Sequence, residues 1–382
     1  MKQKIFNIVN SLVVFIAKLL PMKKQVVFES NPDFADNTLP VYNKMIEKGY
    51  NEKYKFVWLL NGTDTHNLPS NVSEIRRNNG SFADKMKCSW IIARSKYIID
   101  CNTYVRKCRK GQIRIHLKHG LPIKDASAYT HGVGALDVLC VPSEKWLDIC
   151  SKEHGVDKKF IKPLGFPRND ELVVKEHSQK SVMWMPTYRF TAYDFDNGKK
   201  INDGLKYGLP GINSMDELSN INAYLAVKNA ILYVRFHPAQ DTRNIKIDLF
   251  SNIKLCDNEF LNNNSMSLYE FLCITDGLIS DYSSIYYDYL KLEKPIALSV
   301  CDFDEYLENN GIICKTIDEF KATFPAEYLY DYDDLFAFIR KVVENDVVDC
   351  QSVNKAKELY DMASVPNSAE TILNYMIENF DF

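Results

Sequence analysis

Two patterns of apolar and polar residues alternate along most of the chain. Short apolar runs are typical of strands in a parallel sheet, and the longer stretches between them have the spacing of amphipathic helices. In the first half of the chain the short runs predict strands at residues 26–28, 56–60, 97–99, 113–117 and 138–141. The intervening patterns predict helices near residues 42–48, 82–93 and 144–153. This alternation predicts a doubly wound α/β domain that ends near residue 172.

The same alternation resumes after a polar, charged stretch at residues 175–180, which is typical of a linker. Strands are predicted at residues 182–185, 230–236, 278–279 and 296–298, with helices near 216–228, 268–274 and 285–292. Residues 191–210 are polar and contain three glycines, so we expect a long loop over a binding site. Long helices at about residues 333–345 and 353–378 follow. The second domain therefore belongs to the same class as the first.

The first 24 residues combine an apolar run with purely basic charge. Residues 5–20 are mostly apolar, segment 1–24 holds five lysines and no acidic residue, and Asn7, Ser11 and Lys18 fall near one helical face. The run is shorter than the roughly 20 apolar residues that a membrane-spanning helix needs. No small-residue cleavage site follows it, as a signal peptide would require. We therefore expect an amphipathic helix on a membrane surface. The alternatives are a helix packed on the protein's own core and a signal or spanning segment.

Composition narrows the possible functions. A chain of 382 residues, 46% of them hydrophobic, exceeds what one hydrophobic core usually organises, which agrees with two domains. The 47 basic and 50 acidic residues give a net charge of -3, which argues against a general nucleic-acid binder. The ten cysteines include no C-x-x-C pair. We therefore expect reduced thiols in a cytoplasmic protein, with neither a disulfide framework nor a zinc cage.

The turn at residues 280–284, S-D-Y-S-S, lies where a predicted strand meets a predicted helix. Asp281, Ser283 and Ser284 offer caps for that helix, and backbone N–H groups at a helix start favour an anion such as phosphate. An ordinary helix cap without a ligand has the same local sequence. The turn becomes a stronger candidate because other polar clusters also follow predicted strands. Ligands of doubly wound domains bind at the carboxyl ends of their strands.

The first of these clusters, H-L-K-H-G-L-P-I-K at residues 116–124, begins where the predicted strand 113–117 ends. His119 precedes a glycine in this turn, and imidazole is a suitable general base near pH 7. A packed or capped histidine is the alternative. The densest basic stretch of the chain surrounds the turn and could meet phosphates or anionic lipid, or form a solvated face. It contains Arg106, Lys107, Arg109, Lys110, Arg114, Lys118 and Lys124.

Three further clusters place cations or hydroxyls at predicted strand ends or turns. Residues 165–170, G-F-P-R-N-D, carry Arg168, although glycine and proline also suit a plain turn. Thr187 and Arg189 follow the first strand of the second domain, and a guanidinium binds phosphate oxygens bidentately. Arg235 and His237 follow the next strand. The common dinucleotide, P-loop and zinc-protease motifs are absent, so these clusters carry the functional signal.

These clusters also carry a resemblance to a known family. The motifs stand in the family's order as H-G-L-P-I-K at 119–124, G-F-P-R-N-D at 165–170, M-P-T-Y-R at 185–189, R-F-H-P at 235–238 and S-D-Y-S-S at 280–284, followed by Asp288-Tyr289. Over residues 26 to about 315 the chain resembles the CDP-glycerol glycerophosphotransferases of teichoic-acid synthesis and their CDP-ribitol relatives. Leu121 and Met185 replace the family's usual Thr and Ala, and residues 31–34 lack its usual glycines, which leaves the subtype open.

The resemblance implies a fold and a location. It implies an α/β protein of two doubly wound Rossmann-like domains, glycosyltransferase-B-like. The domains would be a membrane-association segment (1–24), an acceptor-side domain (25–172) and a donor-binding domain (173–382). It also implies a peripheral enzyme on the cytoplasmic face of the membrane. Its partners would be an anionic membrane surface and a lipid-linked saccharide or polyol-phosphate acceptor, without nucleic acid; the oligomeric state is open.

The resemblance also implies a reaction. An acceptor hydroxyl attacks the β-phosphorus of CDP-glycerol or CDP-ribitol and CMP leaves, so the donor is a substrate and no tightly bound cofactor is expected. His119, as general base, and His237 are the expected catalytic residues. Donor binding is expected from Thr187, Arg189, Arg235, Asp281, Ser283, Ser284 and Asp288. Lys118, Lys124 and Arg168 are expected to bind the acceptor. The D-x-D at 302–304 is expected to begin a helix, and a metal requirement is left open.

Two other functions fit the same sequence. One is a nucleotide-sugar glycosyltransferase of the same fold, and the other is a catalytically silent, membrane-associated scaffold of a polymer-export assembly. Release of CMP from CDP-alditols would indicate a glycerophosphotransferase, whereas release of UDP from UDP-sugars would indicate a glycosyltransferase. Nucleotide binding would distinguish an enzyme of either kind from a scaffold. The sequence leaves open whether glycerol or ribitol is transferred, whether once or repeatedly, and to which acceptor.

Overall fold

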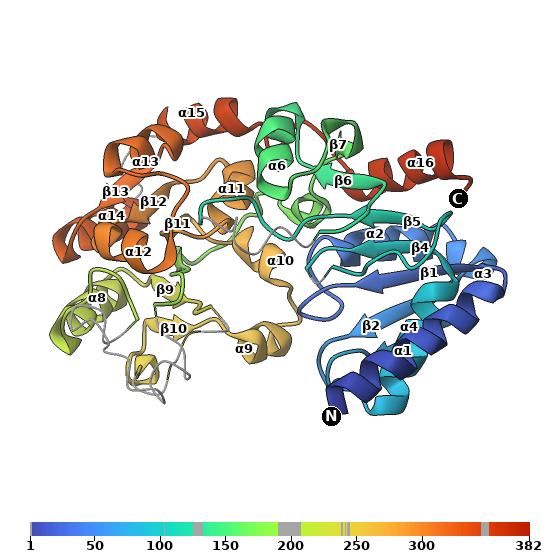
Figure 1. The fold of residues 1–382 in the computed structure, drawn as a ribbon. Helices are drawn as coiled ribbons and strands as arrows, with labels where there is room; N and C mark the ends of the chain where they lie inside the picture. Colours follow the sequence, from blue (N-terminus) through green and yellow to red (C-terminus); the bar gives the residue numbers. More distant parts are fainter. Residues whose placement is uncertain are drawn as a thin grey trace. The chain divides into compact units, whose positions relative to one another are not determined.

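The computed structural model describes residues 2–102, 104–124, 133–189, 208–237, 240, 242, 245–344 and 351–382. They form two compact units, each built around one parallel sheet (Figure 1). Unit 1 comprises Met1–His119, Ser127–Asp170 and Asp361–Phe382, and unit 2 comprises Gly120–Ala126 and Glu171–Tyr360. The long loop expected at residues 191–210 lies almost entirely outside the described residues.

The sheet of unit 1 has seven strands: β1 (Lys23–Glu29), β2 (Lys55–Leu60), β3 (Val72–Arg76), β4 (Ser95–Asp100), β5 (Ile113–His116), β6 (Val138–Val141) and β7 (Ile161–Pro163). Their order is β3-β2-β1-β4-β5-β6-β7, and every neighbouring pair is parallel. The strand order reverses between β1 and β4. The carboxyl ends of these two strands therefore form a topological switch point, where ligands of doubly wound sheets bind.

The helices of unit 1 are α1 (Lys2–Leu19), α2 (Thr38–Glu47), α3 (Tyr50–Lys53), α4 (Phe82–Arg94), α6 (Leu147–His154) and α16 (Ser368–Phe380), with 3-10 turns η1 (Glu144–Trp146), η2 (Lys158–Phe160) and η3 (Pro167–Glu171). Helix α4 begins at a capping box. The Ser81 side chain accepts from the Asp84 backbone N–H, and the Asp84 carboxylate accepts from the Ser81 N–H.

One hydrophobic cluster of unit 1 joins the sheet to α2 and α16. The ring of Phe28 lies 5.1 Å from that of Phe56 and 5.4 Å from that of Trp58. Leu373 and Met376 of α16 are buried in the same cluster. Helix α16 thus packs with α2, although it lies far along the chain from it (Figure 1). The structural division differs here from the expected boundary, which assigned residues 173–382 to one domain.

The six strands of unit 2 have the same relative order as the first six strands of unit 1. The strands of unit 2 are β8 (Ser181–Trp184), β9 (Ile231–Val234), β10 (Ile253–Leu255), β11 (Gly277–Ser280), β12 (Ile296–Ser299) and β13 (Glu327–Leu329). They form a parallel sheet in the order β10-β9-β8-β11-β12-β13, with the switch point between β8 and β11. The helices are α8 (Met215–Val227), α9 (Asn258–Asn263), α10 (Leu268–Leu272), α11 (Ile285–Tyr289), α12 (Phe303–Asn310), α13 (Ile317–Thr323), α14 (Tyr332–Glu344) and α15 (Gln351–Tyr360), with 3-10 turns η5 (Ile247–Leu249) and η6 (Leu290–Leu292).

The expected fold class, two doubly wound α/β units, is confirmed. Helix α12 begins directly after Asp302, so the expected helix start at the D-x-D is also confirmed. The single helix expected at residues 353–378 is wrong, because α15 ends at Tyr360 and α16 begins at Ser368. Pro366 interrupts helical hydrogen bonding, and Asn367 has a φ of +55°, outside the helical region. The chain passes from unit 2 to unit 1 at this break.

Helix α1 packs on α4 and keeps an apolar stripe exposed. The ring of Phe6 lies 6.0 Å from that of Phe82, and Ala17 is fully buried. The exposed stripe has helical spacing, and its members are 43% to 70% exposed: Ile5, Ile8, Leu12, Phe15, Ile16 and Leu19. Within the described ranges, no helix is both long and apolar enough to cross a bilayer.

Candidate active site

His119 is the last residue of the first segment of unit 1. Strand β5 ends at His116, and Lys118 then adopts a left-handed φ of +54°. The His119 side chain beyond this turn is 59% exposed, and its Nδ1 contacts Oδ2 of Asp36. Because a carboxylate only accepts hydrogen bonds, Nδ1 is the donor and Nε2 is the basic atom of the neutral ring.

Asp36 lies in the loop between β1 and α2 and is held at several points. Its Oδ1 accepts from Nη1 of Arg168 at 2.8 Å and from the backbone N–H of Asn37 at 2.8 Å. The side chain is only 5% exposed. Burial alone would raise the pKa of Asp36, but the charges of Arg168 and His119 and their hydrogen bonds outweigh burial and hold that pKa well below its ordinary value. Asp36 is therefore an ionised, buried partner of His119.

Arg168, expected at the acceptor, is directed into unit 1. Its side chain is 6% exposed. Besides Asp36, its Nη1 contacts the backbone carbonyl of His119, and its backbone N–H donates to Oδ1 of Asn37 at 3.0 Å. The guanidinium also lies 4.8 Å from the centre of the Phe166 ring. These contacts make Arg168 part of the framework of the His119 turn.

Lys118, also expected at the acceptor, belongs to an interior polar cluster. Its ammonium donates to Oε2 of Glu153 at 2.6 Å and to Nε2 of His154 at 2.9 Å, and its side chain is 4% exposed. Burial and then the charges of Lys118 and His116 lower the pKa of His154 to about 2. His154 is therefore neutral at neutral pH, and Lys118 is neutralised by Glu153.

Most of the basic stretch around this turn serves the fold. Arg114 is fully buried and donates from Nη2 to Oδ2 of Asp100 at 2.7 Å. Lys107 pairs with Asp137 at 2.7 Å, and Arg109 donates to the carbonyl of Leu20, just beyond α1, at 2.7 Å. Arg106 and Lys110 are exposed. Lys107, Arg109 and Arg114 therefore stabilise unit 1, and the two alternatives left open by the sequence, an anion contact or a solvated face, apply to the exposed Arg106 and Lys110.

In unit 2 the candidate residues gather at the switch point between β8 and β11. Thr187, after β8, donates from its backbone N–H to Asp281 at 2.9 Å and from Oγ1 to Oδ1 of Asp281 at 2.7 Å. Asp281 also accepts from the backbone N–H of Tyr282 at 2.6 Å. Both Thr187 and Asp281 are buried. Asp281 thus ties the loops after β8 and β11 together beneath the switch point.

The guanidinium of Arg189 is buried and contacts two carboxylates, so it does not face solvent. Its Nη2 lies 2.8 Å from Oδ2 of Asp281, and its Nε donates to Oδ2 of Asp302 at 2.6 Å. The side chain is 5% exposed, and its guanidinium lies 4.7 Å from the centre of the Tyr306 ring. Burial would lower the pKa of Arg189, but Asp281 and Asp302 outweigh burial and raise it. The bidentate phosphate contact expected from Arg189 is therefore occupied by carboxylates.

A second set of polar groups surrounds Tyr188. Nζ of Lys124 lies 5.6 Å from the centre of the Tyr188 ring, and the ring of His237 lies 5.0 Å from it, centre to centre. Lys124 was expected at the acceptor, but it belongs to unit 2, where its backbone forms a bridge to Ile312. Burial lowers the pKa of Lys124, and Asp281 opposes this effect. Lys124 and His237 are cationic and hydrogen-bonding groups that suit an anionic ligand.

Ser284 lies against the segment that carries Lys124. A Cβ atom added at Gly120 would stand 2.9 Å from Oγ of Ser284, so only glycine lets the backbone approach this closely. Oη of Tyr287 also donates to the carbonyl of Pro122 at 2.8 Å. Ser283 and Ser284 are partly exposed, and the following helix α11 is only five residues long. This turn can therefore bind a ligand through the hydroxyls of Ser283 and Ser284 more than through the dipole of the short helix.

Arg235 and Asp288 have supporting positions. Arg235 donates from Nη1 to the carbonyl of Cys256 at 2.7 Å and from Nη2 to Oδ1 of Asn258 at 2.7 Å. It therefore joins β9 to the loop after β10. Asp288 on α11 is 1% exposed and accepts from Oη of Tyr269 at 3.4 Å.

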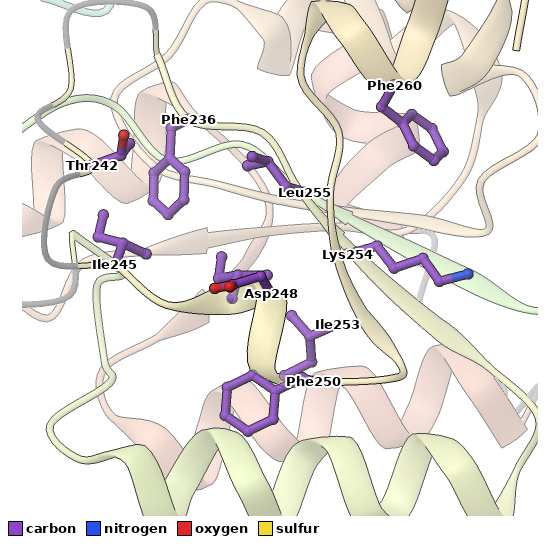
Figure 2. Close-up of a pocket in the computed structure, with 10 residues that line it drawn as sticks. Phe236, Thr242, Ile245, Asp248, Phe250, Ile253, Lys254, Leu255 and Phe260 are labelled. Atoms are coloured by element: carbon purple, nitrogen blue, oxygen red, sulfur yellow. The ribbon is translucent and has the colours of Figure 1, made fainter. Parts of the chain in front are cut away.

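A pocket of about 480 Å³ lies beside the outer strand β10 of unit 2 (Figure 2). Its polar side chains are Thr242, Asp248 and Lys254, and its remaining lining is apolar: Phe236, Ile245, Ile247, Phe250, Ile253, Leu255 and Phe260. One lysine beside one carboxylate is a poor match for the charge of a diphosphate. The groups around Tyr188 suit that ligand better. Among the described residues, no cluster of His, Cys, Asp or Glu has the arrangement of a metal site.

A protein-family model matches most of the chain. The model of the CDP-Glycerol:Poly(glycerophosphate) glycerophosphotransferase family matches residues 12–378. The chain belongs to this family. It is 23% identical to a teichoic acid poly(glycerol phosphate) polymerase of Staphylococcus epidermidis, over 90% of this chain and 49% of that protein. It is 24% identical to the teichoic acid glycerol-phosphate primase of Bacillus subtilis, over 67% of this chain and 61% of that protein.

The glycerophosphotransferase fold is also seen in solved structures. The wall teichoic acid polymerase TagF is similar with a TM-score of 0.74 and 19% identity, over 98% of this chain and 94% of that chain. This likeness shows a shared fold. The chain spans about half the length of the first curated relatives that it matches.

Sequence reasoning missed three residues of the candidate site: Asp36, Tyr188 and Asp302. Asp36 lies 83 positions from His119, and no periodic pattern links the two. Tyr188 stands inside the M-P-T-Y-R motif, next to the two residues that were singled out. Asp302 was noticed only as a helix start. Asp36 and Asp302 are each recognised by a buried contact with an arginine, Arg168 and Arg189 respectively. A linear sequence does not show such contacts.

Proposed function

We propose that this glycerophosphotransferase-family protein transfers glycerol phosphate or ribitol phosphate from a CDP-alditol to a hydroxyl of a membrane-linked acceptor, with release of CMP. The observation that carries the proposal is the gathering of Lys124 and His237 around Tyr188, beside the Ser284 turn and the switch point of unit 2. Cationic and hydroxyl groups at that position of a doubly wound sheet suit a nucleoside diphosphate. The family and its relatives support the same donor class.

The proposed reaction is one displacement at phosphorus. The acceptor oxygen bonds to the β-phosphorus as the bond from that phosphorus to the oxygen bridging the α-phosphate breaks. The acceptor's proton passes to Nε2 of His119, and the electron pair of the broken bond leaves with CMP. Positioning and charge neutralisation dominate such transfers, so the cations near the donor carry much of the rate.

Each residue has a proposed role in this step. Lys124, His237, Ser283 and Ser284 bind the donor diphosphate and stabilise the departing CMP. Thr187, Arg189 and Asp281 hold the switch-point loops that present these groups. Arg235 and Asp288 support the same region through their contacts. The peptide bond between His119 and Gly120 links the proposed base to the segment that packs on Ser284.

Product analysis tests the proposed activity. The purified chain is incubated with CDP-glycerol, CDP-ribitol and UDP-sugars, each with lipid-linked saccharide and polyol-phosphate acceptors, and the released nucleotides are separated by chromatography. We expect CMP and no UDP, and a large loss of turnover in Lys124→Ala but not in Lys254→Ala, the matched lysine of the β10 pocket. UDP release would establish a glycosyltransferase instead. Absence of turnover, together with undetectable nucleotide binding by calorimetry, would favour the scaffold.

His119→Ala tests the base separately. We expect near-complete loss of turnover with donor binding retained, because His119 belongs to unit 1 and the donor groups belong to unit 2. Near-normal turnover in a folded His119→Ala variant would exclude His119 as the base.

We also propose that α1 holds the protein on the anionic, cytoplasmic face of the membrane. The exposed stripe of α1 is apolar, and five lysines and no acidic residue occur in residues 1–24. Apolar area plus cations is what binds an interfacial helix to anionic lipid. Leu12→Glu with Phe15→Glu should abolish co-sedimentation with phosphatidylglycerol vesicles, whereas Ile149→Glu, an exposed apolar site on α6, should not. Unchanged sedimentation of the double variant would contradict this role.

A further inference from the structure

The surroundings of His119 point to a residue that neither the motifs nor the family comparison singles out. We propose that Asp36 is a positioning residue that fixes the tautomer and orientation of the His119 ring, and that Arg168 holds Asp36 for this purpose. The kinetic consequences rest on the proposed function, whereas the tautomer of His119 does not.

The two oxygens of Asp36 have different partners. Oδ1 accepts from Nη1 of Arg168 at 2.8 Å and from the Asn37 backbone N–H at 2.8 Å. Oδ2 accepts from Nδ1 of His119. The carboxylate is therefore anchored on one side by two donors, and its other oxygen alone faces the imidazole. With Nδ1 protonated, Nε2 keeps the lone pair that a general base needs.

The same small group of residues also fixes the backbone that carries His119. Nδ2 of Asn37 donates to the carbonyl of Lys118 at 2.7 Å, and Nη1 of Arg168 contacts the carbonyl of His119. Arg168 and Asn37 are joined in turn by the Arg168 N–H, at 3.0 Å from Oδ1 of Asn37. A ring that is 59% exposed would otherwise change rotamer readily. Here both its backbone and its Nδ1 are held by buried groups.

The burial of Arg168 favours positioning over acceptor binding. The Arg168 side chain is 6% exposed, so little of its guanidinium is open to an acceptor anion. The guanidinium contacts a carboxylate and a carbonyl of its own unit. These contacts keep Asp36 charged, and a charged Asp36 stabilises the imidazolium that forms when Nε2 takes the acceptor's proton. Asp36 itself takes no proton in this step, as in the serine-protease triad.

The anchoring of Oδ1 makes an unusual outcome predictable. In Asp36→Asn the amide oxygen stays with the two donors on the Oδ1 side, because an NH₂ group there would face them. The NH₂ group then faces Nδ1 of His119, which must become an acceptor, and the ring proton moves to Nε2. Nε2 of His119 then carries a proton and cannot accept one from the acceptor hydroxyl. In Asp36→Ala no group forces this tautomer, so we expect the smaller side chain to leave more activity than the isosteric one.

Steady-state kinetics with CDP-alditol and acceptor test this order. We expect kcat to fall roughly 10³- to 10⁴-fold in Asp36→Asn, by analogy with a triad whose tautomer is reversed, and about 10²-fold in Asp36→Ala. KM for the donor should change less than about threefold in both. Asp33→Asn is the matched control, because Asp33 lies in the same loop but accepts from the backbone N–H groups of Asn61 and Gly62. A purely structural role predicts the opposite order, with Asp36→Ala the more damaging change, and would overturn the proposal.

Nitrogen NMR of protein labelled at its seven histidines reads the tautomer directly. The His119 signals are assigned by their loss in His119→Gln. We expect the neutral wild-type ring to carry its proton on Nδ1 and the Asp36→Asn ring to carry it on Nε2. The same tautomer in both proteins would overturn the proposal even where Asp36→Ala does not fold. This readout needs no substrate, so it stands if the proposed reaction fails.

Arg168→Lys separates positioning from acceptor binding. A lysine keeps the charge but cannot reproduce the shared contact to Asp36 and to the His119 carbonyl. Positioning predicts a lower kcat with an unchanged KM for the acceptor. A raised acceptor KM with unchanged kcat would assign Arg168 to the acceptor and remove it from the proposal.

Discussion

Nε of Arg189 donates to Oδ2 of Asp302 at 2.6 Å, while Nη2 of the same guanidinium lies 2.8 Å from Oδ2 of Asp281. Arg189 is thus neutralised by two carboxylates before any ligand arrives. Removing one partner of a buried ion pair costs several kcal/mol, because the other charge stays buried without compensation. The contribution of Arg189 to donor binding should therefore depend on Asp302.

This dependence predicts a change in donor affinity in the opposite direction from the one that charge attraction alone predicts. Asp302→Asn removes a negative charge near the proposed diphosphate site, which alone would tighten donor binding. We expect weaker binding, by roughly tenfold or more, because Arg189 loses one of its two carboxylate partners and the switch-point loops loosen. Calorimetric titration with CDP-glycerol measures the dissociation constant. Asp304→Asn, two residues away and exposed, is the control, and tighter binding in Asp302→Asn would show that Arg189 is a direct phosphate ligand.

The close approach of Gly120 to Ser284 predicts a coupled pair of substitutions. Gly120→Ala places a Cβ 2.9 Å from Oγ of Ser284 and forces that hydroxyl away. We therefore expect Gly120→Ala and Ser284→Ala each to raise the donor KM several-fold, and the double variant to be no worse than either. Additive effects in this double-mutant cycle would mean that the two residues act independently.

The G-F-P-R-N-D turn contains a glycine whose role is structural. Gly165 has a φ of +88°, and an added Cβ would stand 2.1 Å from Oγ of Ser368. Gly165→Ala should therefore lower the free energy of unfolding by roughly 2–4 kcal/mol, through strain and overpacking together. Gly155→Ala isolates the strain, because Gly155 has a φ of +61° and open space around its Cβ position. We expect it to cost about 1 kcal/mol in the same denaturant titration. Equal costs would contradict the contact with Ser368.

Burial of His154 predicts a pH dependence of stability. The pKa of His154 is lowered to about 2 in the folded protein, whereas an unfolded chain protonates this histidine near pH 6.5. The unfolded state therefore binds more protons between these values, and the free energy of unfolding falls with falling pH, by about 1.4 kcal/mol per pH unit. From pH 6.5 to pH 5 we expect wild type to lose about 2 kcal/mol more than His154→Gln. Parallel pH profiles of the two proteins would show that His154 is protonated in the fold.

The central strands of both sheets were predictable, and the outer ones were not. Strands β3, β7, β10 and β13 were missed, and they are the four edges of the two sheets. An inner strand of a parallel sheet is covered on both faces and appears as a continuous apolar run. Three of these edge strands have only three residues, and all four are partly exposed, with residues such as Lys162 of β7 and Lys254 of β10 among them. Their local sequence resembles that of loops.

The candidate site was predictable in its motifs but not in its connections. His119, Thr187 and Asp281 stand at strand ends, where the pattern indicated function. Whether a cation faces solvent or a buried carboxylate depends on residues far away in the chain: Lys118 meets Glu153, and Arg189 meets Asp302. One sequence contains no such pairing information, so both cations were expected to bind substrate.

The placement of α16 in unit 1 has a consequence for protein synthesis. Unit 1 begins at the amino terminus, but the helix that completes its Phe28 cluster follows the whole of unit 2 in the chain. At about 5–20 residues per second, the ribosome needs roughly 10–40 s to make the intervening stretch. During that interval the nascent first sheet exposes the apolar surface that Leu373 and Met376 later cover. Chaperone binding to the growing chain should therefore persist until the codons of α16 have been read.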